Sequence, residues 1–267
     1  PLETYAVIAD YDAVTGVITV RSNFMGPFSM HAVTARALNI DENKLRFIVP
    51  SDIGGSFGIK SSIYPYIVLI SLAAMKAGRP VKWIEDRQEH LLASSCQTDR
   101  VAYREVAVRN DGTLLGIKSK VIENVGAYLR APEPACTFRP IGNFVGPYKV
   151  RNVRLDAYDV MTNKCPTGPN RGYGCQQIYF EQERMMDRIA EELHLDPMEV
   201  RLRNLIPADE IPYTTPMGGI YDSGDYQKAM DRRTSVLGDE HPSTLSSIRI
   251  MGACLVVQAK FMEAEPY

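Results

Sequence analysis

The sequence predicts a mixed α+β fold, because β-hairpins and amphipathic helices alternate along the chain. Residues 5–11 and 17–21 flank a short glycine-containing loop, as the strands of a first hairpin would. Residues 101–108 and 114–122 flank an Asn-Asp-Gly turn and predict a second hairpin. Residues 178–193 place their apolar side chains on one helical stripe. Hairpins interleaved with helices favour mixed sheets over a simple doubly wound parallel sheet.

The other elements follow from local start and stop signals. In chain order they are a helix at 28–38, a strand at 44–49, a helix at about 62–77, a strand at 81–85, a proline-rich loop at 131–147 and a strand at 152–160. Pro27 is well placed near the start of the first helix, since proline suits the first helical turn. Gly78 and Pro80 end the second helix.

Composition limits the class of partner. The chain has 267 residues, enough for one large domain or two modest ones, and is 45% hydrophobic and 23% charged. A formal charge of −2 gives no sign of a nucleic-acid partner or an anionic membrane partner. The most apolar run, residues 63–75, suits a buried helix and is too short to span a bilayer. With no signal-peptide pattern, we expect a cytoplasmic protein, and a start without Met suggests a fragment or processed chain.

The cysteines and histidines predict no metal site formed by side chains. The five cysteines are widely spaced and include no Cys-x-x-Cys pair, so neither an iron–sulfur cluster nor structural zinc is expected. The four histidines are not clustered. Reduced, buried thiols are the expected state of such cysteines in a cytosolic protein.

A glycine-rich loop at residues 54–60 lies between a predicted strand and a predicted helix. Gly54, Lys60 and Ser61 fit a phosphate-binding loop, but Ile59 stands where the second glycine belongs. A β-branched residue is poorly suited to the positive φ often needed there. A nucleotide-binding loop and a purely structural turn therefore remain alternatives.

A second glycine-containing turn, Pro-Asn-Arg-Gly-Tyr-Gly-Cys-Gln-Gln at residues 169–177, leads into the helix at 178–193 and then into the string at 196–204. Shorter strings support the same comparison: Gly-Arg-Pro-Val-Lys-Trp-Ile-Glu-Asp-Arg at 78–87, Gly-Ala-Tyr at 126–128 and Gly-Pro-Tyr at 146–148. In this order and spacing, from about residue 2 to residue 230, they resemble the molybdenum-cofactor subunit of the xanthine dehydrogenase and aldehyde oxidase family.

The resemblance implies an enzyme with a bound redox cofactor. Residues 1–232 would be the first half of the family's cofactor region, with the α+β fold of the molybdopterin-binding domain. The cofactor would be molybdenum–molybdopterin in its cytosine dinucleotide form, and the reaction would oxidise an aldehyde or N-heteroaromatic small molecule with oxygen from water. Electrons would leave through iron–sulfur and FAD subunits, consistent with the lack of cysteine clusters here.

Five residues are implied to contact the cofactor through exposed main chain: Gly55, Phe57 and Gly58 in the first loop, and Arg171 and Gly172 in the second. A residue without a side chain lets amide donors reach oxygen or sulfur ligands of a metal. We therefore expect the two loops to meet in space around one cavity.

The resemblance also implies substrate contacts. Tyr173 would stack on a flat substrate, or alternatively be a core aromatic behind the turn. Arg139 would orient the substrate, or alternatively be a solvated arginine in a proline-rich loop. Glu183 and Asp187, one helical turn apart, could suggest an acid–base pair, but we expect them to form a polar helix face with arginines of the same helix.

Departures from the family pattern narrow the activity. Ser61 replaces a glutamate of the purine-oxidising members, which disfavours xanthine as the substrate. Gly172 replaces the copper-binding cysteine of carbon monoxide dehydrogenases, which disfavours carbon monoxide. Met25 replaces a glutamine near the molybdenum oxo ligand, and a thioether cannot donate that hydrogen bond. The family's catalytic glutamate has no counterpart, so no catalytic residue is assigned and the chain alone is predicted to be inactive.

Residues 233–267 are predicted to be a divergent tail. Residues 234–247 resemble the linker between repeats of kinesin-light-chain-like tetratricopeptide proteins, but only one copy is present. A fusion or a changed reading frame near Asp231 would explain it. The competing hypothesis is a non-catalytic interaction protein that retains the enzyme scaffold and binds through this tail.

Overall fold

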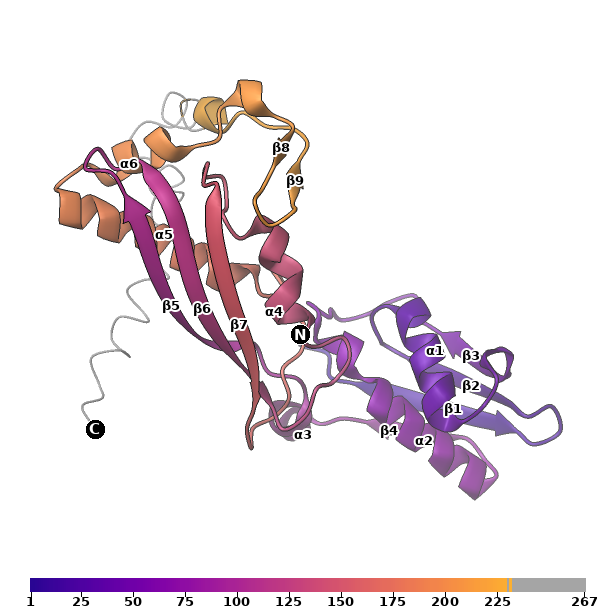
Figure 1. Ribbon diagram of the computed structural model, residues 1–267. Helices are drawn as coiled ribbons and strands as arrows, with labels where there is room; N and C mark the ends of the chain where they lie inside the picture. Colours follow the sequence, from indigo (N-terminus) through magenta and orange to yellow (C-terminus); the bar gives the residue numbers. More distant parts are fainter. Residues whose placement is uncertain (230, 232–267) are drawn as a thin grey trace. The chain divides into compact units, whose positions relative to one another are not determined.

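The computed structural model describes residues 1–229 and residue 231 (Figure 1). The predicted tail at 233–267, with its tetratricopeptide-like string, lies outside the described residues, and its boundary after residue 232 stays a prediction. The described chain forms two compact units, and each consists of three segments that are not contiguous in the sequence. The first consists of Pro1–Asp99, Glu123–Thr137 and Asp159–Tyr173, and the second of Arg100–Ile122, Phe138–Tyr158 and the chain from Gly174 onward.

The first unit is built on a four-stranded sheet with the order β3-β2-β1-β4. Its strands are β1 (Ala6–Asp12), β2 (Val17–Ser22), β3 (Leu45–Ile48) and β4 (Val81–Ile84). β1 pairs antiparallel with both β2 and β4, which confirms the first hairpin. β2 and β3 are parallel, and α1 (Pro27–Leu38) provides the long crossover that parallel neighbours require.

Two helices bury one face of this sheet. Alternate residues of β1 and β2 are buried, and they pack with α1 and α2 (Tyr64–Ala77) in one hydrophobic core. Figure 1 shows the two helices side by side against the sheet. α2 is only partly buried, because Leu69 is 61% exposed and Leu72 46% exposed, so the expectation of a buried helix is wrong for that side. No helix among the described residues has the length and hydropathy needed to cross a membrane.

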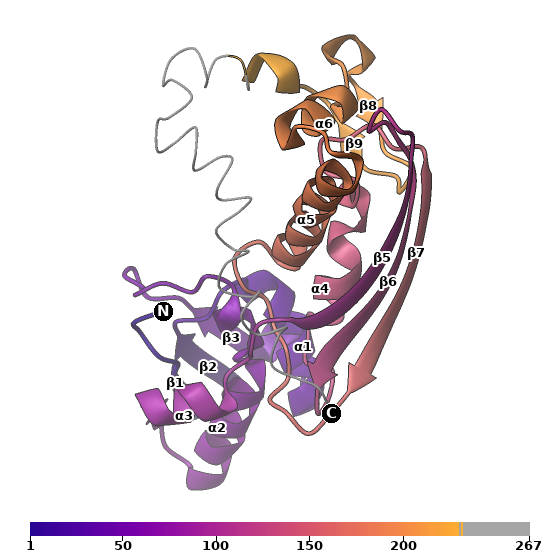
Figure 2. The same cartoon turned by 90° about the vertical axis from the view of Figure 1, so that its left-hand side faces the viewer.

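The second unit contains most of a three-stranded sheet with the order β5-β6-β7. The strands are β5 (Asp99–Val108), β6 (Leu114–Gly126) and β7 (Asn152–Met161). The turn between β5 and β6 is closed by the bond from the Arg109 amide to the Thr113 carbonyl, at 3.0 Å, as expected for the second hairpin. Figure 2 shows α5 (Cys175–Leu193) lying along the inner side of the curved sheet.

The predicted stripe of α5 forms the core of the second unit. Ile178, Met185, Met186 and Ile189 are buried and pack with residues of β6 and of the segment after α4. The fold class predicted from the sequence, mixed α+β, is confirmed.

Several short elements were not predicted. They are α3 (Arg87–Ala93), α4 (Ala135–Phe138), α6 (Pro197–Asn204), β8 (Tyr213–Thr214) and β9 (Ile220–Tyr221). α3 starts with a capping box, in which Asp86 and Glu89 each accept a bond from the other's backbone amide. α6 starts in the same manner with the Asp196 side chain bonded to two amides of its first turn.

Candidate functional site

The two glycine-containing loops lie against each other in the first unit. Gly58 has φ 110°, and a Cβ placed on it would lie 2.6 Å from the carbonyl oxygen of Pro169. No side chain fits at that distance, so the first loop touches the main chain of the second directly. The guanidinium carbon of Arg171 also lies 4.8 Å from the centre of the Phe57 ring, a cation–π contact.

Both loops hold a bulky residue in the left-handed region of backbone space. Phe57 has φ 55° and Tyr173 has φ 50°, values that favour glycine over residues with a side chain. Strained backbone of this kind persists only where surrounding contacts enforce it, and it concentrates at functional sites.

Ser56 holds the first loop from inside. Its hydroxyl accepts bonds from the amides of Gly58 and Lys60, at 3.4 and 3.3 Å, and donates to the Met25 sulfur at 3.4 Å. No residue in the described part of the chain accepts a hydrogen bond from the amide of Phe57 or of Gly172. Each loop therefore has an amide whose hydrogen-bonding capacity is unused among the described residues, and a ligand with anionic oxygen or sulfur atoms would suit such donors.

Lys60 does not serve as a phosphate-binding lysine. Its side chain is fully buried and pairs with the carboxylate of Glu3, which also accepts the Gly54 amide at 3.0 Å. Burial raises the pKa of Glu3, but hydrogen bonds from Lys60 and Asn23 outweigh it, so the pKa lies below its usual value. The ion pair ties the N-terminal segment to the loop, and the nucleotide-binding alternative finds no support.

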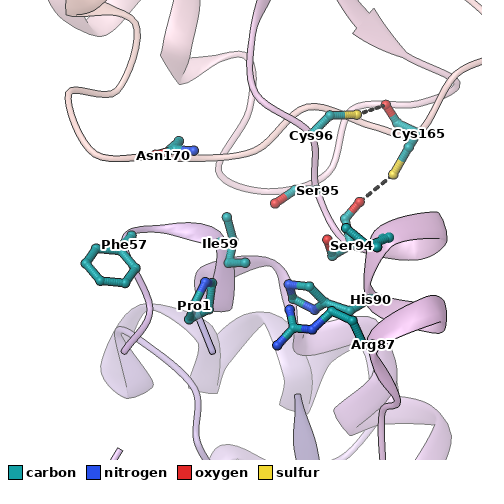
Figure 3. A pocket seen from close by; sticks show the side chains of 11 residues that line it. Pro1, Phe57, Ile59, Arg87, His90, Ser94, Ser95, Cys96, Cys165 and Asn170 are labelled. Carbon is teal, nitrogen blue, oxygen red and sulfur yellow. Dashed lines mark hydrogen bonds between the residues drawn. The ribbon is translucent and has the colours of Figure 1, made fainter. Parts of the chain in front are cut away.

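A cavity of about 520 Å³ in the first unit borders both loops (Figure 3). Phe57 and Asn170 line it from the loops, and His90, Ser95 and Cys96 line it from α3 and the segment that follows. Nδ1 of His90 lies 2.5 Å from the carboxylate of Glu85. This wall of the cavity was missed by reasoning from the sequence.

Two free thiols form one corner of the cavity. The Cys96 thiol donates to the Cys165 carbonyl at 3.0 Å, and the Cys165 thiol donates to the Ser94 carbonyl. Burial and the neighbouring Cys96 raise the pKa of Cys165, which keeps that thiol protonated. Within the described residues, no three His, Cys, Asp or Glu side chains are arranged to hold a metal ion.

Comparison with known proteins assigns this chain to a family. Residues 1–205 match the family model of the molybdopterin cofactor-binding domain. The chain belongs to this family.

Curated members with similar sequences are much longer than this chain. The carbon monoxide dehydrogenase large chain of Hydrogenophaga pseudoflava is 36% identical over 239 residues, which cover 87% of this chain and 29% of that protein. The 6-hydroxypseudooxynicotine dehydrogenase complex subunit gamma of Paenarthrobacter nicotinovorans is 34% identical over 236 residues, covering 85% and 29%. The chain thus spans under a third of these relatives.

Solved structures of molybdopterin-binding enzymes have the same fold. Quinoline 2-oxidoreductase from Pseudomonas putida 86 superposes with a TM-score of 0.83 at 30% identity, covering 95% of this chain and 32% of that one. The aldehyde oxidoreductase of Desulfovibrio gigas gives a TM-score of 0.78 at 26% identity, covering 89% and 25%. The resemblance found in the sequence, to the molybdenum-binding subunits of xanthine dehydrogenase and aldehyde oxidase relatives, is confirmed.

The residues proposed to contact substrate lie in different units of this molybdopterin-binding chain. Tyr173 ends the last segment of the first unit and is half-buried. Arg139 opens a 3₁₀ turn (Arg139–Asn143) in the second unit and is exposed. Their roles toward substrate stay predictions.

The expected polar face with arginines of the same helix holds for Asp187, which pairs with Arg184 at 3.8 Å, but it is wrong for Glu183. It is buried and accepts bonds from the Tyr148 hydroxyl at 2.9 Å and from Arg201 Nε at 2.8 Å. Arg201 also donates to Asp187 at 2.7 Å. Burial and the adjacent Glu183 charge raise the pKa of Tyr148. The network joins α5 to α6 and is structural.

The string at 196–204 likewise has a packing role. Asn204 is buried, accepts the Leu114 amide at 2.8 Å and donates to the Gly112 carbonyl at 2.8 Å, which fixes the turn between β5 and β6. The packing contacts of Asn204 and Arg201 therefore account for these two residues of the 196–204 string, and no contact with a ligand is needed to explain them.

Proposed function

We propose that this chain supplies part of the molybdenum-cofactor site of a hydroxylase that oxidises an aldehyde or an N-heteroaromatic compound. The observation that supports it most strongly is the direct main-chain contact of the two loops at Gly58 and Pro169, each of which has an amide without an acceptor among residues 1–229 and 231. The family match supports the cofactor, and the relatives' names support the substrate class: nicotine 6-hydroxylase, quinoline 2-oxidoreductase and aldehyde oxidoreductase.

The chain's own residues would bind and orient the cofactor. The amides of Phe57 and Gly172 would donate hydrogen bonds to its anionic atoms, alongside Gly55, Gly58 and Arg171 in the same loops. When bound, the molybdenum cofactor supplies the two-electron redox chemistry that introduces an oxygen from water. The Arg171–Phe57 contact would hold the two loops against each other.

The finer features of the proposal rest on individual positions. Ser61 and Gly172 argue against purines and carbon monoxide, even though a carbon monoxide dehydrogenase chain is among the similar sequences. Tyr173 would stack on the flat substrate, and Arg139 would orient it. The cytosine dinucleotide form of the cofactor and separate iron–sulfur and FAD subunits complete the proposal. The subunit architecture is supported by relatives that are named as large chains and as a complex subunit.

The test is cofactor retention in the full subunit coexpressed with candidate iron–sulfur and FAD subunits. The wild type is expected to carry molybdenum and pterin, and Gly58→Ala is expected to lose most of both. Gly78→Ala is the matched control, because it makes the same change at a positive φ with nothing within 4 Å of the added carbon. A wild type without molybdenum would refute the proposal and favour a non-catalytic interaction protein. This chain purified alone is expected to show no dye-linked oxidation of aldehydes or N-heterocycles.

A further inference from the structure

His90 is held by a buried carboxylate at the edge of the cavity. Nδ1 lies 2.5 Å from Glu85 Oε2, and the residues are only 4% and 2% exposed. Glu85 is itself fixed, since Oε2 also accepts the Tyr5 amide at 3.0 Å. A carboxylate on Nδ1 selects the tautomer that carries its proton there and leaves Nε2 with a lone pair.

The other ring nitrogen is the one available to the cavity. No residue in the described ranges forms a hydrogen bond with Nε2 of His90. His90 lines the cavity together with Phe57 and Asn170, and Figure 3 places its imidazole among the side chains around this space. Ser95 lines it too, and its buried hydroxyl has no partner in the described chain. Water in the cavity would satisfy both groups.

The charged and titratable surroundings of His90 come from several elements. Arg87 lies on the same helix, and the Tyr5 ring packs edge-on against the imidazole at 5.2 Å. Arg130 is buried nearby, with Nη2 3.5 Å from the Ala93 carbonyl, and its other two nitrogens have no hydrogen-bond partner in the part of the chain that the structure describes. The thiols of Cys96 and Cys165 and the N-terminal residue Pro1 also line the cavity. Among these side chains, a neutral imidazole is the one that carries both an N–H donor and a nitrogen lone pair, so it can accept one proton and pass on another.

The proposed reaction requires such a group. Conversion of R–H and H₂O to R–OH releases two protons and two electrons per turnover. The electrons pass to an iron–sulfur partner, and the protons must reach bulk water. We propose that His90 is a proton relay for this site: Nε2 accepts a proton from water in the cavity and releases it to solvent, while Glu85 acts as the positioning residue. After the proton has been accepted and released, the imidazole is back in its starting state. This inference rests on the proposed function.

The first test needs no cofactor. In this chain labelled with ¹⁵N-histidine, neutral His90 is expected as the Nδ1–H tautomer, and Glu85→Gln is expected to shift the population toward Nε2–H. A wild-type His90 found as the Nε2–H tautomer would overturn the relay, because the lone pair would then face Glu85 rather than the cavity.

The second test uses the assembled holoenzyme and chemical rescue. His90→Gly is expected to keep its molybdenum content but to lower kcat by about 10²-fold, the lower end of general acid–base effects. Added imidazole is expected to restore at least tenfold, in proportion to its neutral form. His31→Gly, the same change on α1 in the same unit, controls for helix destabilisation and is expected to show no rescue.

The outcomes separate the two proposals. A wild type without molybdenum or turnover refutes the proposed function, and the tautomer measurement still decides the relay geometry. A loaded wild type that turns over, combined with a loaded His90→Gly variant that is equally fast or is not rescued by imidazole, overturns the relay alone.

Discussion

Gly58→Ala should destabilise the first unit by removing the space in which the two loops touch. With φ 110° and ψ −37°, Gly58 lies outside the left-handed helical region, so a residue with a Cβ is strained there by at least the cost of that region, roughly 1–2 kcal/mol. The added carbon would also lie 2.6 Å from the carbonyl oxygen of Pro169 and 2.8 Å from its carbonyl carbon. These are main-chain atoms that cannot rotate away, and overpacking of this kind costs about 1–3 kcal/mol. The expected total is about 2–5 kcal/mol.

Gly78→Ala separates the two contributions. Gly78 ends α2 with φ 60° and has nothing within 4 Å of an added Cβ, so only the backbone strain of about 1–2 kcal/mol applies. The difference between the variants should therefore be at least about 1–3 kcal/mol, because the overpacking cost is added to a backbone strain at Gly58 that is no smaller than at Gly78.

The assay is urea unfolding of this chain followed by tryptophan fluorescence. The only tryptophan, Trp83, lies in β4 of the same unit and stacks on Tyr66 at 4.8 Å, so its emission reports the first unit. Unchanged m-values would show that the variants differ in stability rather than in the surface exposed. If Gly58→Ala costs no more than Gly78→Ala, the two loops are not in contact and the site argument fails.

Two further predictions concern ion pairs. Arg201→Met should destabilise the second unit by about 3–5 kcal/mol in urea unfolding followed by far-UV circular dichroism, because it leaves Glu183 buried without its cation. Arg188→Met, which breaks exposed ion pairs within α5, should cost at most about 1 kcal/mol. Equal losses of stability in the two variants would contradict the buried network. The pKa of Glu3 is lower in the folded chain than in the unfolded chain. Its carboxylate therefore contributes to folding stability at pH values above the unfolded-state pKa, and this contribution is lost as the pH falls through the folded-state pKa. The stability gap between wild type and Glu3→Gln should thus be constant near neutral pH and shrink below about 4.5, and a gap that persists in acid would disprove the assignment.

The sequence was sufficient where structure is set by local pattern. The apolar stripe of residues 178–193 predicted α5 because helical spacing alone places those side chains on one face. The first hairpin followed from its turn and its alternation. The parallel pairing of β2 with β3 could not be predicted from the sequence, because it depends on a helical crossover whose path no local signal specifies.

The side-chain networks could not be predicted for a related reason. Glu183 and Arg201 are 18 positions apart, and only the packing of α6 on α5 makes them partners. His90 and Glu85 are closer in sequence, and one signal was available: the Asp86-x-x-Glu89 capping box starts the short helix that carries His90. Reading that box would have predicted α3, but not the cavity it borders.

The candidate site could be proposed from the sequence because the chemistry proposed for it belongs to the main chain. A ligand bound by amide groups needs positions where a side chain is absent, and this requirement appears directly as glycine at a turn. Gly58 shows why the requirement is strict, since the Pro169 carbonyl occupies the place of its Cβ. The polar side chains of Ser56 and Lys60, by contrast, bond to other residues of the chain and support the loop, so their role is structural. In a loop of this kind, the residues with the least side chain carry the most information about the ligand.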